Sequence, residues 1–274
     1  MKSEKRISAI YNSLCDRFPT FRKVTHRWLY EIMARNMRQE TWSFMNYGYA
    51  CGSGEEIPKL EPIDEPHRLS YQLYHHLACK VPIENKFVLE VGSGRGGGAS
   101  FIHKYLNPAR MTGVDYSREA VKLCQKRHSA AGLEYIQGDA EHLPFPDESY
   151  DVILNVESSH CYGSVPAFLD EVARVLKPDG YFLMTDIRQQ KDLPELRKFL
   201  SSGSLTVLEE KEITDQVIHA LDIDHESRLL SIRNHVPKAF LGPFMEFAGV
   251  KGSTILSDLQ SGRVVYVSFF CRKT

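Results

Sequence analysis

Short apolar runs alternate with longer amphipathic stretches through the middle of the chain. The short runs are rich in β-branched and aromatic residues, which favours strands, whereas the longer stretches repeat apolar residues at helical spacing. The predicted strands are 87–91, 111–115, 134–138, 150–156 and 181–187, and the predicted helices between them are 100–106, 117–128 and 164–176. Nearly continuous apolar strands that alternate with helices are typical of an α/β fold with a doubly wound, mostly parallel sheet.

The regions that flank this repeat predict additions to the sheet. Residues 1–80 show helical spacing on both sides of a loop rich in Pro and Gly, and we interpret them as an N-terminal helical cap or lid. Residues 81–274 then form the main domain, into which polar, helical residues at about 189–240 insert as a second lid element. Two final runs, 251–256 and 263–272, predict a C-terminal β-hairpin. The expected result is a seven-stranded, Rossmann-like sheet with one antiparallel strand.

Composition excludes several classes of protein. A net charge of −1 argues against a basic nucleic-acid-binding face. Six scattered cysteines without a C-x-x-C pair indicate reduced thiols. No apolar run is long enough to span a bilayer, and the N-terminus lacks an apolar signal core, so we expect a cytoplasmic protein. The basic stretch 22–27 is interpreted as a solvated helix face, with weak membrane-surface association as the alternative. His75 and His76 have no acidic partner at ligand spacing, and no metal site is predicted.

The first predicted strand ends abruptly in glycines and is followed by a helical pattern. Gly92, Gly94, Gly96 and Gly97 allow the backbone to adopt positive φ and to approach a ligand closely. The free amides at the start of the following helix favour an anionic or electron-rich group. The strand, turn and helix therefore predict the floor of a nucleotide-like cofactor site.

The glycine spacing alone fits two cofactors. Gly92, Gly94 and Gly97 match the dinucleotide pattern G-x-G-x-x-G, whereas Gly92, Gly94 and Gly96 match the E/D-x-G-x-G-x-G loop of S-adenosylmethionine (SAM) methyltransferases. Glu90 favours the second, because a carboxylate at the end of a buried strand needs a partner. The amino group of SAM supplies that partner, although a nearby Lys or Arg would also do so.

Polar residues follow each of the five predicted strands, and ligands of open α/β sheets bind beyond the carboxyl ends of the strands. Asp115 is placed to accept the ribose hydroxyls, and Asp139 and Ala140 to bind the adenine. The aromatic residues of the cap fit a lid over the cofactor and a hydrophobic core equally well, and Tyr47 is the best candidate among them for a contact with the cofactor. The predicted cofactor-binding residues are Tyr47, Glu90, Gly92, Ser93, Gly94, Gly96, Asp115, Tyr116, Asp139, Ala140, Glu141 and Asn155.

The motifs of residues 87–187 resemble those of class I SAM-dependent methyltransferases, with LEVGSGRGGG, GVDYS, GDAEHLPFPDESYDVI and RVLKPDGYFLMTD in order. A narrower resemblance covers nearly the whole chain. FMNYGYA, DEPHR, QLYHHLA, LNVESSHCY and the final AGVKGSTILSDLQSGRVVYVSFFC are similar to the phthiotriol and phenolphthiotriol dimycocerosates methyltransferase family. That resemblance implies O-methylation of a hydroxyl on a long-chain polyketide lipid. Residues 201–224 are only loosely similar, which leaves the acceptor open.

An aliphatic hydroxyl attacks a methyl group well only while its proton is being removed. His160 is the candidate base, because an unperturbed histidine titrates near neutral pH, and Asp186 is placed to fix its tautomer. The resemblance supports this pair, since related small-molecule O-methyltransferases carry a His after the fourth strand and an Asp at the end of the fifth. Glu157 and His235 are assigned to the substrate site. For both histidines the alternative is a structural loop or helix-end residue.

These features favour a SAM-dependent O-methyltransferase for a small-molecule, polyketide or lipid-like metabolite. Methylation of carbon or nitrogen on the same fold is the first alternative. A nicotinamide-dependent oxidoreductase would share the glycine turn but should lack Glu90 and the Asp139 site. A non-catalytic binding protein with a methyltransferase fold should have a degraded turn, whereas the turn here is intact.

Overall fold

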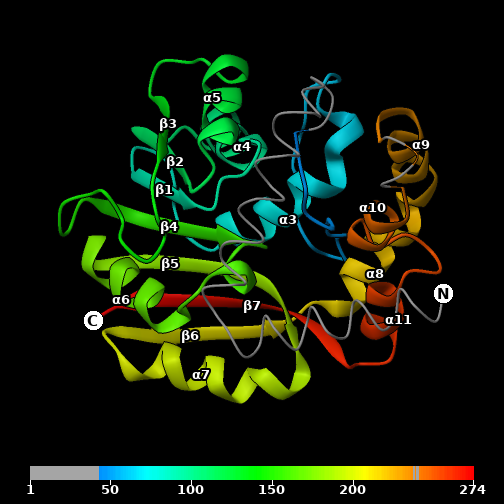
Figure 1. Ribbon diagram of the computed structural model, residues 1–274. Helices are drawn as coiled ribbons and strands as arrows, with labels where there is room; N and C mark the ends of the chain where they lie inside the picture. The colour runs from blue at the N-terminus through cyan, green and yellow to red at the C-terminus, as the bar shows by residue number, and fades with distance from the viewer. Residues whose placement is uncertain (1–42, 237, 239–240) are drawn as a thin grey trace.

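The computed structural model describes residues 43–274 except 237 and 239–240. The described residues form a seven-stranded sheet in the order β3-β2-β1-β4-β5-β7-β6 (Figure 1). The strands are β1 (Phe87–Val91), β2 (Arg110–Asp115), β3 (Leu133–Gln137), β4 (Tyr150–Val156), β5 (Leu176–Gln189), β6 (Leu205–Glu212) and β7 (Val264–Lys273). Strands β1 to β5 are parallel, and β7 runs antiparallel between β5 and β6. The predicted seven-stranded, mostly parallel sheet is therefore confirmed.

Helices cover both faces of the sheet. The α-helices are α3 (Arg68–Ala78), α4 (Gly97–Leu106), α5 (Arg118–Arg127), α6 (Val165–Val175), α7 (Leu193–Ser202), α8 (Thr214–Ile223), α9 (His225–His235), α10 (Leu241–Phe247) and α11 (Thr254–Gln260). Short 3-10 turns are η1 (Glu65–His67), η2 (Ser159–Cys161) and η3 (Gln190–Asp192). Serine caps begin two of the predicted helices, because Ser117 accepts from the amide of Ala120 and Ser164 from that of Ala167.

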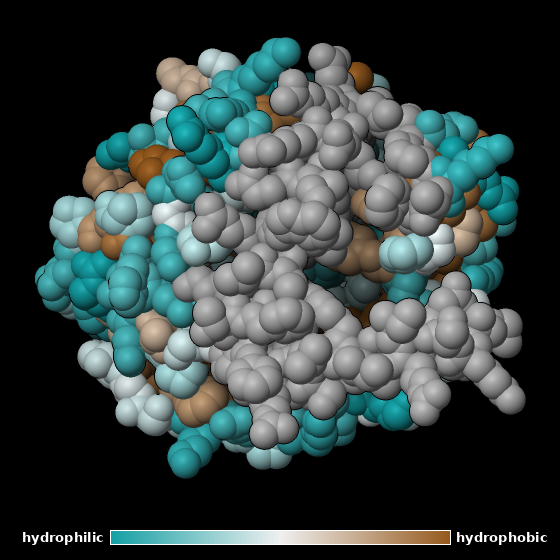
Figure 2. Space-filling model, viewed as in Figure 1, coloured by the Kyte–Doolittle hydropathy of each residue, from teal (hydrophilic) through white to brown (hydrophobic). Residues whose placement is uncertain are grey.

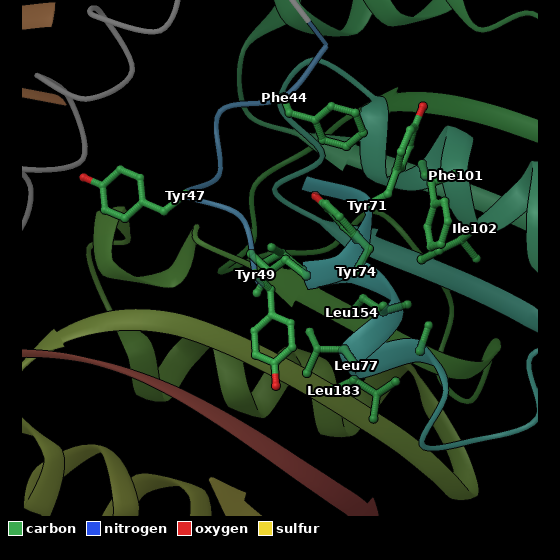
Figure 3. Close-up of a cluster of buried hydrophobic side chains, with 14 of the residues drawn as sticks. Phe44, Tyr47, Tyr49, Tyr71, Tyr74, Leu77, Phe101, Ile102, Leu154 and Leu183 are labelled. Carbon is green, nitrogen blue, oxygen red and sulfur yellow. The ribbon is translucent and has the colours of Figure 1, made fainter. Parts of the chain in front are cut away.

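Alternate residues along the central strands enter two separate cores. Val88 and Leu154 belong to the core beneath α3 and α4, whereas Leu89 and Ile153 belong to the core beneath α6 and α7. The period of two along a strand explains this division. In Figure 3, the aromatic rings on the α3 and α4 side gather around Tyr71 and Tyr74. The nearly continuous apolar sequence of these strands is thus explained by burial on both faces.

The predicted C-terminal hairpin is correct in its antiparallel pairing but wrong in its first strand. Residues 254–260 form helix α11, which Ser253 caps by accepting from the amide of Leu256, and the partner of β7 on its outer side is β6. Strand β6 lies inside the region expected to be a helical lid. Its residues alternate between more and less exposed positions at the edge of the sheet, and the less exposed face is apolar only at Leu205 and Val207 before it continues with Glu209 and Lys211. That weak pattern does not distinguish the strand from a polar helix.

Residues 43–50 form a strap that lies over the carboxyl ends of the parallel strands. The amide of Tyr49 donates to the carbonyl of Leu69 at 2.9 Å, and the amide of Ala50 donates to that of Gln216 at 3.2 Å. The strap is therefore tied to both α3 and α8. The helices expected before residue 41 lie outside the described residues, and the division into a cap at 1–80 and a main domain at 81–274 stays a prediction.

The described surface is mainly hydrophilic on the face shown in Figure 2, where hydrophobic residues form separate patches. Within the described part of residues 43–274, no helix has the length and apolar character needed to cross a bilayer. The same part of the chain contains no group of three or more His, Cys, Asp or Glu side chains placed to hold a metal ion.

Candidate active site

A cavity that is partly open to solvent lies between the strap, the glycine turn and the ends of β4 and β5. Six of the predicted site residues line it: Tyr47, Gly92, Ser93, Gly94, Glu157 and His160. The other lining residues are Ser43, Phe44, Met45, Asn46, Tyr74, Arg95, Gly97, Gly98, Val156, Ile187 and Phe247. The structure therefore brings part of the predicted cofactor set and the candidate base into one space.

Glycine is required where the turn meets its neighbours. Gly96 has a φ of +83° and is the N-cap of α4, and its Cα faces the side chains of Cys124, His128 and Tyr135 rather than the cavity. A Cβ on Gly98 would lie 2.1 Å from the ring of Tyr74. Side chains at these glycines would therefore prevent α3, and a ligand in the cavity, from packing closely against the first turn of α4.

Glu90 is fully buried at the end of β1. The hydroxyl of Tyr74 donates to its Oε1 at 2.6 Å, whereas Oε2 has no hydrogen-bond partner among the described residues. Burial raises the pKa of Glu90 to about 8, against the opposing effect of the hydrogen bond from Tyr74. Only one of the two Glu90 carboxylate oxygens therefore has a hydrogen-bond partner among the described residues. That partner is Tyr74, not a Lys or Arg.

Four buried side-chain atoms lack a hydrogen-bond partner in the described part of the chain, two on residues that line the cavity and two on fully buried residues of β1 and β4 outside that lining. They are Asn46 Nδ2, Glu90 Oε2, Ser93 Oγ and Asn155 Oδ1. Such groups are rare in folded proteins, because a buried polar atom without a partner costs about 1–3 kcal/mol. A ligand with both donors and acceptors at one end would satisfy them, as the amino acid end of SAM would.

The acidic residues after β2 and β3 are held by backbone amides. Asp115 accepts from the amides of Gly94 and Ser117, each at 2.8 Å, which ties the end of β2 to the glycine turn. Asp139 accepts from the amide of Glu141 at 3.0 Å, and Glu141 accepts from that of Gly163 at 2.8 Å. A carboxylate accepts up to about four hydrogen bonds, enough to hold a turn and to contact a ligand as well.

The remaining cofactor candidates lie outside the lining of the cavity. Tyr116 and Ala140 are partly exposed beside these carboxylates. Asn155 is fully buried and donates to the carbonyl of Val91 at 2.9 Å and to Tyr162 at 3.0 Å, so it joins the ends of β4 and β1.

His160 and Asp186 form the predicted pair. His160 Nδ1 lies 2.7 Å from Asp186 Oδ1, and the His160 amide donates to Oδ2 at 3.0 Å. Burial alone would lower the pKa of His160, but Cys161 and the Asp186 carboxylate raise it well above the ordinary value. Arg188 forms an ion pair of 2.9 Å with Asp186 and, with His160, keeps the pKa of this buried carboxyl below its usual range despite desolvation. The side chain of His160 remains 30% exposed, so its ring can reach a ligand.

Glu157 lies beside His160 in a left-handed backbone conformation, with a φ of +46°. Such a conformation costs a non-glycine residue about 1–2 kcal/mol. Its Oε1 accepts from the amide of Tyr47 at 2.6 Å and from the hydroxyl of Tyr266 at 2.5 Å. Burial raises its pKa to about 7. Glu157 therefore lines the cavity with a carboxyl group of raised pKa, and its hydrogen bond from Tyr47 connects it to the strap.

Several residues of the site were not predicted from the sequence. Tyr74 and Tyr266 each hydrogen-bond to a buried carboxylate, and Arg188 completes the Asp186 pair. Tyr74 lies in QLYHHLA and Tyr266 in AGVKGSTILSDLQSGRVVYVSFFC, and the similarity of these two motifs to the family is the signal that the sequence gives for the tyrosines. His235 ends α9, but its side chain lies outside the described part of the chain, so its assignment to the substrate site stays a prediction.

Residues 89–184 match the family model of a methyltransferase domain. Two solved structures share the fold. The (4+2)-cyclase SpnF has a TM-score of 0.68 at 17% identity, over 90% of this chain and 94% of that one. Geranyl diphosphate C-methyltransferase from Streptomyces coelicolor A3(2), solved with Mg²⁺, geranyl diphosphate and S-adenosyl-L-homocysteine, has a TM-score of 0.64 at 15% identity, over 89% of this chain and 98% of that one. The fold and the matched domain define a class I SAM-dependent methyltransferase.

Two relatives narrow this class. The phthiotriol/phenolphthiotriol dimycocerosates methyltransferase of Mycobacterium tuberculosis (strain ATCC 25177 / H37Ra) is 38% identical over 90% of this chain and 91% of its own length. The fatty-acid O-methyltransferase of Mycolicibacterium smegmatis (strain ATCC 700084 / mc(2)155) is 42% identical over 81% of this chain and 80% of its own. The chain belongs to the phthiotriol/phenolphthiotriol dimycocerosates methyltransferase family. The predicted family and its cofactor, SAM, are thereby confirmed, and the family found is not one of nicotinamide-dependent oxidoreductases.

Proposed function

We propose that this protein transfers the methyl group of SAM to a hydroxyl oxygen of a lipid-like acceptor, with His160 as the general base. Two observations support this most directly: the buried Glu90 carboxylate in β1 has an oxygen without a hydrogen-bond partner among the described residues, and His160, which lines the cavity, is paired with Asp186. The first is suited to a cationic amino group and the second to proton removal. The names of both relatives, which refer to a dimycocerosate lipid and a fatty acid, support a lipid-like acceptor.

The donor site in this proposal extends from the strap to the ends of β1, β2 and β3. SAM supplies an activated methyl group on a sulfonium when it is bound. Glu90 accepts from its amino group, Asp115 from the ribose hydroxyls, and Asp139 and Ala140 contact the adenine. Tyr47 and the glycine turn cover the same ligand from the cavity side. The strap and helices α8 to α10 act as the lid.

His160 acts through the nitrogen that Asp186 leaves free. The 2.7 Å bond to Asp186 assigns the Nδ1 proton to that contact, so Nε2 is the basic nitrogen. As the acceptor oxygen forms its bond to the methyl carbon, the carbon–sulfur bond breaks with its electron pair moving to sulfur, and Nε2 takes the hydroxyl proton. Holding the two reactants in line and away from water contributes roughly 7–11 kcal/mol to such reactions. The lid elements over the cavity serve this positioning.

The acceptor atom is tested by incubating the protein with methyl-labelled SAM and three probes of equal chain length: a long-chain alcohol, a fatty acid and an amine. We expect a labelled methyl ether from the alcohol, identified by mass spectrometry. A labelled ester from the fatty acid alone would still place the methyl group on oxygen. It would contradict a hydroxyl acceptor and the need for a base, because a carboxylate carries no proton to remove. Label on nitrogen or carbon alone would contradict O-methylation.

A pH profile tests the base. A histidine acts as a base only when neutral, and a raised pKa keeps His160 protonated to a higher pH. With the alcohol, kcat/KM should therefore rise with pH through a value above the ordinary histidine pKa of about 6.5 and then level off. Glu157, Cys161, Asp186 and Arg188 are the neighbouring charged and titratable groups. Changing Asp186 to Asn should move the acid limb to lower pH and lower the plateau, and an unmoved limb would reject the assignment to His160.

A further inference from the structure

Asn46, in the strap, has a buried amide that faces the cavity. The side chain is 7% exposed and lines the cavity. Its Oδ1 accepts from the amide of Gly48 at 3.1 Å, and only an oxygen can accept there, so the orientation of the amide is fixed. Nδ2 is left without a hydrogen-bond partner among the described residues. A buried amide donor without a partner thus belongs to a residue that lines the cavity.

Ser93, in the glycine turn, presents a second such group. It is 4% exposed and lines the same cavity, and its Oγ has no partner in the described part of the chain. The strap lies directly on this turn, because a Cβ added at Gly94 would come within 2.9 Å of Met45 Cε. Asn46 Nδ2 and Ser93 Oγ are therefore unpaired hydrogen-bond donors on residues that line the cavity, whereas Glu90 Oε2 and Asn155 Oδ1 are unpaired acceptors on buried residues outside its lining.

The two kinds of unpaired atom match the two charges of an amino acid. An ammonium group has only donors and suits the acceptors, and a carboxylate has only acceptors and suits Asn46 and Ser93. We infer that Asn46 Nδ2, together with Ser93 Oγ, binds the carboxylate of the amino acid end of SAM. This inference rests on the proposed donor site, and it adds Asn46 to the residues that hold the cofactor.

The backbone of Asn46 is fixed independently of its side chain. Arg228, on α9, donates to the carbonyls of Asn46 and Tyr47 at 3.2 and 3.1 Å, and the amide of Tyr47 donates to Glu157. The donor amide is therefore preorganised, and a substitution of nearly equal size at position 46 leaves the strap in place. Asn46→Asp keeps the acceptor for Gly48 and replaces only the unpaired NH₂ with an oxygen.

The test compares two ligands by isothermal titration, S-adenosylhomocysteine and its decarboxylated analogue, on the full chain. Asn46→Asp should weaken binding of S-adenosylhomocysteine by about tenfold or more, since a charge-assisted donor becomes a repelling acceptor, and should leave the decarboxylated analogue within about twofold. Ser93→Ala should show the same selectivity to a smaller extent. Asn234→Asp, which adds the same charge at an exposed position of α9, is the matched control and should change neither affinity.

Equal weakening of both ligands by Asn46→Asp, or no weakening of either, would overturn the inference. Ser93→Ala decides the question independently should Asn46→Asp unfold, as judged by circular dichroism. Failure of the unaltered protein to bind S-adenosylhomocysteine would instead overturn the proposed function. The two failures are therefore distinguishable in one set of titrations.

Discussion

Changing His160 to Ala is expected to lower kcat for a long-chain alcohol by about 10²–10⁴-fold, the usual contribution of a positioned base. The change removes the proposed base and leaves the proposed cofactor-binding residues Glu90 and Asp115 in place. The Kd for SAM, measured by isothermal titration, should therefore stay nearly constant. Steady-state kinetics and titration on the same preparation separate the two effects.

Two further variants show whether the loss is chemical. His160→Gln retains a side chain that can hydrogen-bond to Asp186 but has no basic nitrogen, so it should be nearly as slow as His160→Ala. His219→Ala removes an exposed histidine from α8 and should behave like the unaltered protein. Turnover of His160→Ala at the rate of the His219→Ala control would reject His160 as the base.

The sheet could be predicted from the sequence because its strands are short, apolar and interrupted by glycine or helical stretches. Burial on both faces makes β1 and β4 nearly continuous apolar runs, and short runs of this kind between turn residues are typical of buried parallel strands. The sequence predicts a helical lid where strand β6 lies, because this edge strand carries charged residues on both of its faces. It predicts a strand where helix α11 lies, because this helix is short and its capping residue, Ser253, resembles a turn residue.

Local sequence predicts those site residues whose chemistry follows from their position after a strand. Glu90, Asp115 and His160 were predicted in this way, and their roles stay predictions. The tyrosines that hydrogen-bond to the carboxylates were not, because Tyr74 and Tyr266 approach from α3 and β7, elements far away in the sequence. The unpaired amide of Asn46 is visible only once every neighbouring donor and acceptor has been placed. The sequence indicates which groups carry charge, whereas the fold determines which of them remain unsatisfied.

Changing Glu90 to Gln is expected to weaken SAM binding by roughly thirtyfold or more, since loss of one partner of a buried charge pair costs about 2–5 kcal/mol. Gln keeps the size of the side chain and an oxygen for the hydrogen bond from Tyr74, so the glycine turn should keep its shape. Isothermal titration with SAM measures the loss. Glu119→Gln, in the first turn of α5, neutralises a carboxylate away from the cavity and should bind SAM normally.

Glu90→Gln should also be more stable than the unaltered protein at pH 8 in the absence of ligand. The pKa of Glu90 is raised to about 8, so between its unfolded value near 4.5 and pH 8 the folded state binds the extra proton. Stability from this group is therefore full below pH 4.5 and falls as the pH rises. Glu90→Gln removes that loss, and its melting temperature should exceed that of the unaltered protein by more at pH 8 than at pH 5. Weakened SAM binding without this gain would mean that the substitution disrupts the turn, whereas the two effects together require a buried carboxylate that is held for a cationic ligand.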